Sequence, residues 1–309
     1  MLWFFLACGP VLVNFDDTQD TPDTGVATSG LPDGQWSLGQ PDDGFGWAMH
    51  WDGHRLYMSA PGASSLYSVK GDGPLVEEEI GLGDGTALHS HQGVLFVSQS
   101  RSEGGRGVLP DGTTGQGAAA RAQLSMGESH LVLDGRGIWQ DGSHQDLGLW
   151  GSALVRLDEE WVVSASQGSP ALRTQSGLSL ERLSALDEAG ASMVACDVDG
   201  DGSQELVLGA PGAGQVYIYE SLGASPQILG SGEGRFGQSL ACGAQGLAIG
   251  APMESGGQGA VYQLEGQDLV RIYEGAGHAG NTLLAAEEGL FAAETGASVE
   301  DPGLVLRLY

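Results

Sequence analysis

The sequence has very little positive charge and no long apolar segment. Of its 309 residues only 12 are Lys or Arg, a single one of them a lysine, against 40 Asp and Glu, so the formal net charge is −28. A nucleic-acid-binding protein is excluded, because phosphate contacts need clustered basic side chains. No run approaches the roughly 20 apolar residues of a membrane-spanning helix, which excludes a polytopic membrane protein.

Glycine, by contrast, is abundant, with 53 residues or about one in six. Each interior glycine costs a helix roughly 1 kcal/mol, so a helical protein is disfavoured. Wholesale disorder is also disfavoured, because 41% of the residues are hydrophobic and they occur in short runs. The composition therefore favours a protein of short strands and many turns.

The N-terminus reads as a processing segment followed by a spacer. Residues 1–8 are an apolar run that ends in Leu-Ala-Cys and resembles a bacterial lipoprotein signal, with Cys8 as the lipidated residue. The alternative is a frayed apolar N-terminus with a free cysteine. Residues 9–33 are acidic and rich in Thr, Asp and Pro, so we predict a disordered tether.

Residues 34–309 consist of repeated units, each of which begins with a glycine. A small residue and then an apolar residue usually follow this glycine. Short runs rich in Val, Leu, Ile and Tyr follow, bounded by Gly, Pro, Asp or Ser, which is typical of strands and turns. Three or four strands in about 40 residues describe a propeller blade. The opening glycines are Gly46, Gly85, Gly117, Gly151, Gly190, Gly237 and Gly280.

This spacing predicts an all-β, seven-bladed β-propeller. The units that begin at Gly85 and Gly117 depart from the pattern, so the alternative is six blades with one long insertion in the 85–150 region. The last unit ends after its third strand, and residues 34–38 form an unassigned strand-like stretch before the first unit. We therefore predict that this stretch completes the last blade as its outer strand and closes the ring.

Several motifs resemble FG-GAP repeats, the repeat of the integrin α-subunit propeller and its bacterial relatives. The motifs are F-G-W-A-M from Phe45, R-F-G-Q-S-L from Arg235, G-A-P from Gly250 and the whole unit from Gly190 to Tyr219. The resemblance implies adhesion or protein recognition through loops on one face, without catalysis.

One unit carries a candidate metal loop of the pattern D-x-D-x-D-G-x-x-E. Ca²⁺ takes six to eight oxygen ligands, and carboxylates at alternating positions of a tight loop can converge on one ion. We expect one structural Ca²⁺ site, with an additional ligand from the Ser203 backbone carbonyl. The FG-GAP family usually places Asp at the ninth position, where this chain has Glu. The predicted ligands are Asp197, Asp199, Asp201, Ser203 and Glu205.

Three further signals carry less weight. Cys196 and Cys242 occupy near-equivalent places in adjacent units, so a disulfide and two buried thiols are both open. His89 and His91 would share one strand face and could bind a metal, but surface histidines are the simpler interpretation. A G-x-G-x-x-G pattern ending at Gly280 falls in the repeat register, which disfavours nucleotide binding.

The combined expectation is a calcium-stabilised, monomeric, extracytoplasmic propeller that is tethered to a membrane by a lipid anchor. It would act as a non-catalytic binding, adhesion or scaffold module for an unknown protein or glycan. Its negative charge disfavours anionic partners. A lectin-like propeller with sugars in pockets between blades is the alternative. An enzyme is the third hypothesis, and it predicts carboxylates or histidines that converge at the mouth of the central channel.

Overall fold

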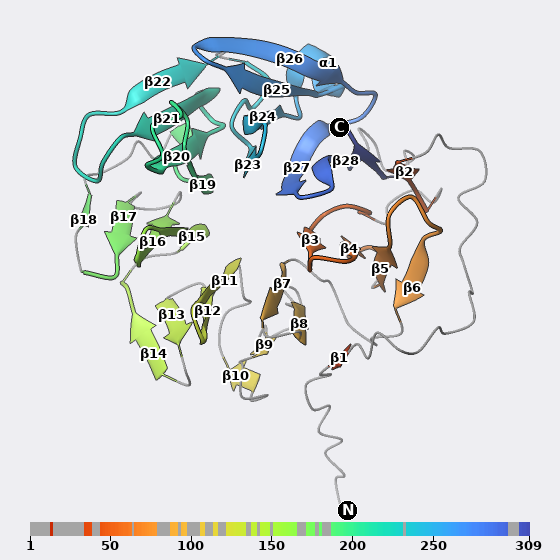
Figure 1. Cartoon of the computed structure of the whole chain (residues 1–309), viewed down its shortest axis with the longest axis horizontal. Helices are drawn as coiled ribbons and strands as arrows, with labels where there is room; N and C mark the ends of the chain where they lie inside the picture. Colours follow the sequence, from red (N-terminus) through yellow and green to blue (C-terminus); the bar gives the residue numbers. More distant parts are fainter. Residues whose placement is uncertain are drawn as a thin grey trace, which may run out of the picture.

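The computed structural model places short antiparallel sheets around a ring, with the strands of each four-stranded sheet running from the centre outwards (Figure 1). The all-β propeller expected from the repeats is confirmed. The residues that the structure describes are 13–14, 34–38, 44–63, 65–78, 87–91, 94–97, 106–108, 114–116, 122–133, 137–140, 143–148, 151–165, 171–176, 179–180, 187–230, 233–295 and 303–309.

Six blades are four-stranded sheets, and five of them are continuous in sequence. The first contains β3 (Met49–Trp51), β4 (Leu56–Ala60), β5 (Ser65–Val69) and β6 (Val76–Glu78). The second contains β11 (Ala122–Met126), β12 (Ser129–Leu133), β13 (Gly137–Gln140) and β14 (Ser143–Asp146). The third contains β15 (Ala153–Leu157), β16 (Glu160–Ala165), β17 (Ala171–Thr174) and β18 (Ser179–Leu180). The fourth contains β19 (Ser192–Cys196), β20 (Glu205–Ala210), β21 (Gln215–Tyr219) and β22 (Gln227–Gly230). The fifth contains β23 (Ser239–Gly243), β24 (Gly246–Ala251), β25 (Ala260–Glu265) and β26 (Asp268–Glu274).

The sixth four-stranded sheet combines the two ends of the propeller sequence. It contains β27 (Ala279–Ala286), β28 (Gly289–Glu294) and β29 (Leu304–Arg307), with β2 (Gln35–Trp36) as its fourth strand. In the antiparallel register Gln35 lies opposite Leu306, and Trp36 lies opposite Val305. The predicted outer strand from residues 34–38 is therefore paired with the last blade.

The predicted count of seven blades is corrected to six four-stranded blades among the described residues. Between the first and second of these, the described residues form two hairpins, one of β7 (Leu88–His91) with β8 (Val94–Val97) and one of β9 (Arg106–Val108) with β10 (Thr114–Gln116). The physical reason is visible in the sequence, because residues 98–121 are rich in Gly, Ser and Arg and hold no apolar run of strand length. This arrangement agrees with the six-blade alternative with an insertion.

Two residues of the predicted tether are part of a sheet. β1 (Val13–Asn14) pairs with β8, with Val13 opposite Leu95 and Asn14 opposite Val94. The other residues of segments 1–8 and 9–33, including Cys8, lie outside the described part of the chain.

Glycine pairs explain how neighbouring blades approach so closely. A Cβ atom on Gly209 would lie 1.9 Å from the carbonyl oxygen of Gly237, and one on Gly250 would lie 2.0 Å from that of Gly280. The same two carbonyls accept hydrogen bonds from serine hydroxyls of the preceding blade, Ser192 to Gly237 at 2.8 Å and Ser239 to Gly280 at 2.6 Å. Gly237 and Gly280 therefore each pack against the G-A-P glycine of the blade before it.

The core lies between facing sheets. One apolar cluster joins the fourth and fifth blades and includes Val207, Phe236 and Ile249, all fully buried. Another joins the sixth blade to the first and includes Trp36, Phe45 and Phe291. Burial of such side chains is the main driving force that holds the blades face to face. Within the described residues, no helix is long and apolar enough to cross a membrane.

Candidate functional site

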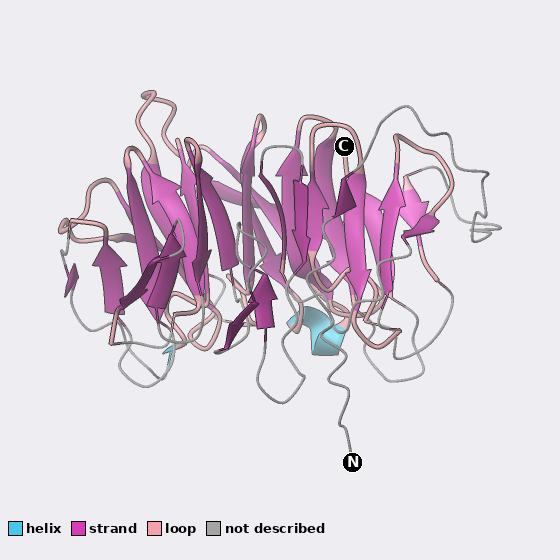
Figure 2. Cartoon of the chain, turned by 90° about the horizontal axis from the view of Figure 1, so that it is seen from below, coloured by secondary structure: helices cyan, strands magenta, loops and turns pink. Residues whose placement is uncertain are grey.

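The predicted metal loop connects β19 to β20 in the fourth blade. Turns between first and second strands all lie on one face of the propeller. The short helical turn α1 (Glu254–Gly257) connects second and third strands, so it lies on the opposite face (Figure 2). The loop begins directly after Cys196 and ends at Glu205, and these two residues are cross-strand partners. Both ends of the loop are thus fixed by the antiparallel pairing of β19 with β20.

Backbone hydrogen bonds to the loop carboxylates set the shape of the loop. Asp197 accepts from the amides of Gly200 at 2.8 Å and Gly202 at 3.0 Å. Both glycines have positive φ, +79° and +92°, which a residue with a side chain rarely adopts. At the base, a carboxylate oxygen of Glu205 accepts from the amide of Val198 at 2.7 Å. The tight turns that the glycines permit therefore bring the ends of the loop together.

The structure brings three of the predicted ligands together. One carboxylate oxygen from each of Asp197, Asp199 and Glu205 lies within 4.8 Å of the others. Asp201 and Ser203 do not belong to this group. They lie at the exposed tip of the loop, where the Asp201 carboxylate accepts from the Ser203 amide at 2.7 Å.

The chemistry of this donor set fits a hard divalent cation. Glu205 is 5% exposed, and a buried carboxylate needs hydrogen bonds, an opposite charge or a metal to offset its lost hydration. In the described ranges, no Lys, Arg or His forms an ion pair with any of the three carboxylates. Oxygen donors at this spacing can surround one Ca²⁺ ion, with water completing the shell.

A disulfide joins the base of this loop to the next blade. Cys196 and Cys242 are bonded to each other, with their Cα atoms 5.6 Å apart. Of the two alternatives left open by the sequence, the structure contains the disulfide. It links β19 to β23, so the residue that precedes Asp197 is covalently attached to the fifth blade.

A row of three histidines crosses neighbouring sheets on the other side of the ring. The rings of His50 and His89 lie 5.6 Å apart, and those of His89 and His130 lie 5.4 Å apart. His50 Nε2 forms a 2.8 Å hydrogen bond with the Ser90 hydroxyl, and His89 Nε2 forms one of 2.7 Å with the Ser125 hydroxyl. These bonds connect β3 to β7 and β7 to β11, the first strands of successive sheets.

The sequence reasoning identified only one member of this histidine row. It paired His89 with His91, two residues along one strand, whereas the structure places His89 between His50 and His130. The available signal was positional, because His50 and His89 both stand four residues after an opening glycine. Burial lowers the pKa of His50 to about 4, although the nearby Asp52 carboxylate opposes this shift. His50 is therefore neutral near pH 7.

Comparison with protein families identifies one repeat. Residues 189–219 match the family model of the FG-GAP repeat, and this segment contains the whole metal loop. The chain thus carries an FG-GAP repeat in a β-propeller, as the motifs indicated. No curated protein matches the sequence.

Solved structures share the fold at low identity. Virginiamycin B lyase from Staphylococcus aureus has a TM-score of 0.64 and 14% identity, over 89% of this chain and 98% of the lyase. The bacterial surface component PorZ of Porphyromonas gingivalis has a TM-score of 0.57 and 15% identity, over 89% of this chain and 38% of PorZ. The extracellular domain of BT4673 from B. thetaiotaomicron has a TM-score of 0.57 and 14% identity, over 83% of this chain and 37% of that one.

The comparison corrects the expectation that this propeller does not catalyse. That expectation rested on the FG-GAP resemblance, but the chain matches a lyase over nearly the whole length of both proteins. At 14% identity the likeness concerns the fold alone. The architecture therefore gives no ground for excluding an enzyme.

Proposed function

We propose that this FG-GAP repeat propeller is an extracytoplasmic binding module whose fourth blade is stabilised by one Ca²⁺ ion. The observation that carries the proposal is the convergence of Asp197, Asp199 and Glu205 within the repeat that matches the family. Like-charged groups this close repel one another, and a divalent cation converts that repulsion into attraction.

The loop would hold the ion through carboxylates from both of its ends. Asp197 and Asp199 supply oxygens from the first half, and buried Glu205 supplies one from the start of β20. The Asp201 carboxylate and the Ser203 carbonyl, which we predicted as ligands, would join by a rearrangement of the exposed tip. The ion would then fix the strand pair β19–β20 and leave the tip exposed for contacts.

Location outside the cytoplasm is supported by two features. Cys196 and Cys242 form a disulfide, and such bonds persist in oxidising compartments. PorZ is described as a bacterial surface component, and the BT4673 domain as extracellular. We infer that Cys8 carries a lipid anchor and that the propeller acts as a monomer on an unknown protein or glycan.

Calcium titration by calorimetry, together with thermal unfolding in Ca²⁺ and in EDTA, tests the proposal. We expect one site per chain and a higher unfolding temperature in Ca²⁺, because a ligand that binds only the folded state stabilises it. The double variant Asp197→Asn/Asp199→Asn should lose both effects. Its matched control is Asp158→Asn/Glu159→Gln, which removes the same charge from the corresponding turn of the third blade. Equal behaviour of the two variants would contradict the proposal.

Catalysis at the histidine row is a second candidate function, favoured by a specific observation. An enzyme was expected to gather perturbed carboxylates or histidines near the central channel, and His50, His89 and His130 lie on or beside first strands of the ring. Because a group with a pKa of about 4 is a weak base at neutral pH, the uncharged His50 ring would orient the substrate rather than take its proton.

The compound to test first is quinupristin, because a catalytically inactive form of the similar Staphylococcus aureus lyase was solved with it. Mass spectrometry would follow quinupristin after incubation with the wild type, with His50→Ala and with the control His144→Ala. His144 lies on the exposed outer strand β14. Product from the wild type and the control alone would support catalysis at the row. No product from any of the three would contradict this candidate reaction.

A further inference from the structure

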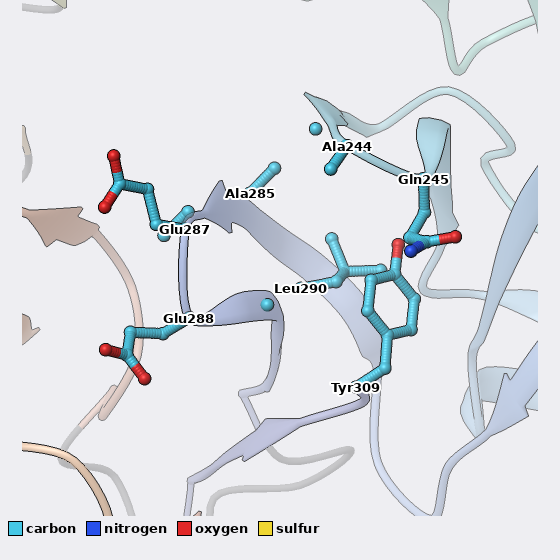
Figure 3. A pocket seen from close by; sticks show the side chains of 10 residues that line it. Ala244, Gln245, Ala285, Glu287, Glu288, Leu290 and Tyr309 are labelled. Atoms are coloured by element: carbon cyan, nitrogen blue, oxygen red, sulfur yellow. The ribbon is translucent and has the colours of Figure 1, made fainter.

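A pocket lies between the fifth and sixth blades, on the same face of the propeller as the metal loop. It is a pocket of about 280 Å³ between the β23–β24 turn and the β27–β28 turn. Tyr309, which follows β29, forms one wall, and Leu290 and Ala285 contribute apolar surface. Figure 3 shows Gln245, Leu290 and Tyr309 together on one side, whereas the exposed side chains of Glu287 and Glu288 extend from the β27–β28 turn away from Tyr309.

The aromatic wall is fixed before any ligand binds. The Tyr309 hydroxyl donates to Gln263 Oε1 at 3.0 Å, and Gln263 Nε2 in turn donates to the backbone carbonyl of Gln245 at 2.5 Å. Behind the ring, the Tyr309 carbonyl oxygen lies only 1.6 Å from where a Cβ of Gly289 would stand, so residue 289 must be glycine. A prearranged wall lowers the entropy lost on binding.

The lining has negative charge and no positive charge. Among the ten residues that line the pocket, Glu287 and Glu288 are ionisable acids and none is basic. The nearest cation along the strand, Arg307, is engaged elsewhere, because its guanidinium pairs with Asp72 at 2.6 Å. The field at the pocket mouth therefore favours a cation, and the net charge of −28 raises the local concentration of cations.

We propose that this pocket binds the side chain of an arginine or lysine from a basic peptide. The alkyl stem would lie against Leu290 and the ring of Tyr309, where a cation also gains from the aromatic face. The charged end would reach Glu287 and Glu288 at the mouth. A volume of about 280 Å³ admits one side chain of this size and excludes a large folded ligand.

A pair of peptides that differ only in charge tests the proposal. Acetyl-Gly-Arg-Gly-amide and acetyl-Gly-citrulline-Gly-amide have nearly the same shape, but citrulline is neutral. In NMR titrations at low salt, we expect the arginine peptide to shift the amide signals of Gln245, Leu290 and Tyr309 with saturation. The citrulline peptide should bind about two- to fivefold more weakly, in line with a loss of one exposed charge interaction.

Variants separate the pocket from the general acidity of the surface. Glu287→Gln/Glu288→Gln should weaken binding of the arginine peptide about two- to fivefold, whereas Asp158→Asn/Glu159→Gln should leave it unchanged. Equal losses in the two variants, or equal binding of the two peptides, would overturn the proposal. No residue that lines the pocket belongs to the metal loop, so the arginine peptide should bind equally well in EDTA. The titration in EDTA therefore separates this proposal from the calcium proposal. If spermidine binds with saturation and the arginine peptide does not, the ligand is a polyamine rather than a peptide side chain, and the proposal is overturned.

Discussion

Cys196 and Cys242 join the first strands of two adjacent blades by a disulfide, and Cys196 is the residue immediately before the candidate ligand Asp197. The covalent link and the metal loop therefore share one anchor point. Cys196 also lies opposite Glu205 in the strand pair, so the disulfide holds the strand position that faces the third candidate ligand.

This relationship predicts that the disulfide supports both folding and metal binding. The variant Cys196→Ser/Cys242→Ser should be about 2–4 kcal/mol less stable, because the closed loop of the unfolded chain is released. Its calcium affinity should fall several-fold, since the base of the loop gains freedom that binding must remove. Urea unfolding and calorimetry measure the two effects. A variant with reduced stability and unchanged calcium affinity would show that the disulfide does not contribute to calcium binding by the loop.

The close approach at Gly250 gives a prediction about blade packing. Gly250→Ala would place a methyl group 2.0 Å from the backbone carbonyl of Gly280, so the two blades must separate, at about 2–4 kcal/mol of stability. The control is Gly266→Ala, where the added Cβ meets nothing within 4 Å and only the positive φ of +63° is strained. That change should lower stability by about 1–2 kcal/mol. Equal losses in denaturant unfolding would refute the packing argument.

The pairing of β2 with β29 predicts that the N-terminal strand holds the ring together. Trp36 is 2% exposed and packs on Phe291, with their ring centroids 6.3 Å apart. Trp36→Ala should therefore lower stability by about 3–5 kcal/mol. Trp47→Ala is the matched control, because Trp47 is 47% exposed and should lose less than about 1 kcal/mol. Similar losses from both would mean that β2 adds little to closure.

Much of this architecture could be predicted from local sequence, because each blade repeats its own turn and strand chemistry. The glycines at 190, 237 and 280 mark blade starts, and the paired stretch near Trp36 could be inferred from the missing fourth strand of the last unit. The blade count failed where the repeat itself weakens, in residues 85–121. There no apolar run signals a third or fourth strand, so spacing alone was a poor guide.

The sites were predictable to different degrees for a physical reason. Asp197, Asp199 and Glu205 lie within nine residues of one another, so their convergence follows from one loop. The histidine row draws on three sheets, and the proposed cation pocket draws on two turns and Tyr309. Such groupings depend on which blades become neighbours and on how their faces meet, which a single sequence does not reveal.

The histidine row predicts a specific sensitivity to acid. The pKa of His50 is lowered to about 4 in the folded protein, compared with 6.5 when unfolded, so the folded state binds its proton less readily. The stability from neutral His50 is thus present above pH 6.5 and is lost as the pH falls towards 4. The groups that face it are the Asp52 carboxylate, which favours the proton, and the His89 ring, whose own charge would oppose it.

Unfolding free energies of the wild type and of His50→Gln, measured between about pH 7 and pH 4, isolate this contribution from other titrating groups. The difference in unfolding free energy between the wild type and His50→Gln should shrink by up to about 3 kcal/mol over this range. This value is the pKa difference converted to free energy. The control His144→Gln, at an exposed position on β14, should keep a constant difference from the wild type. If the curve of His50→Gln instead stays parallel to that of the wild type, protonation of His50 does not destabilise the folded protein and the lowered pKa of His50 is wrong.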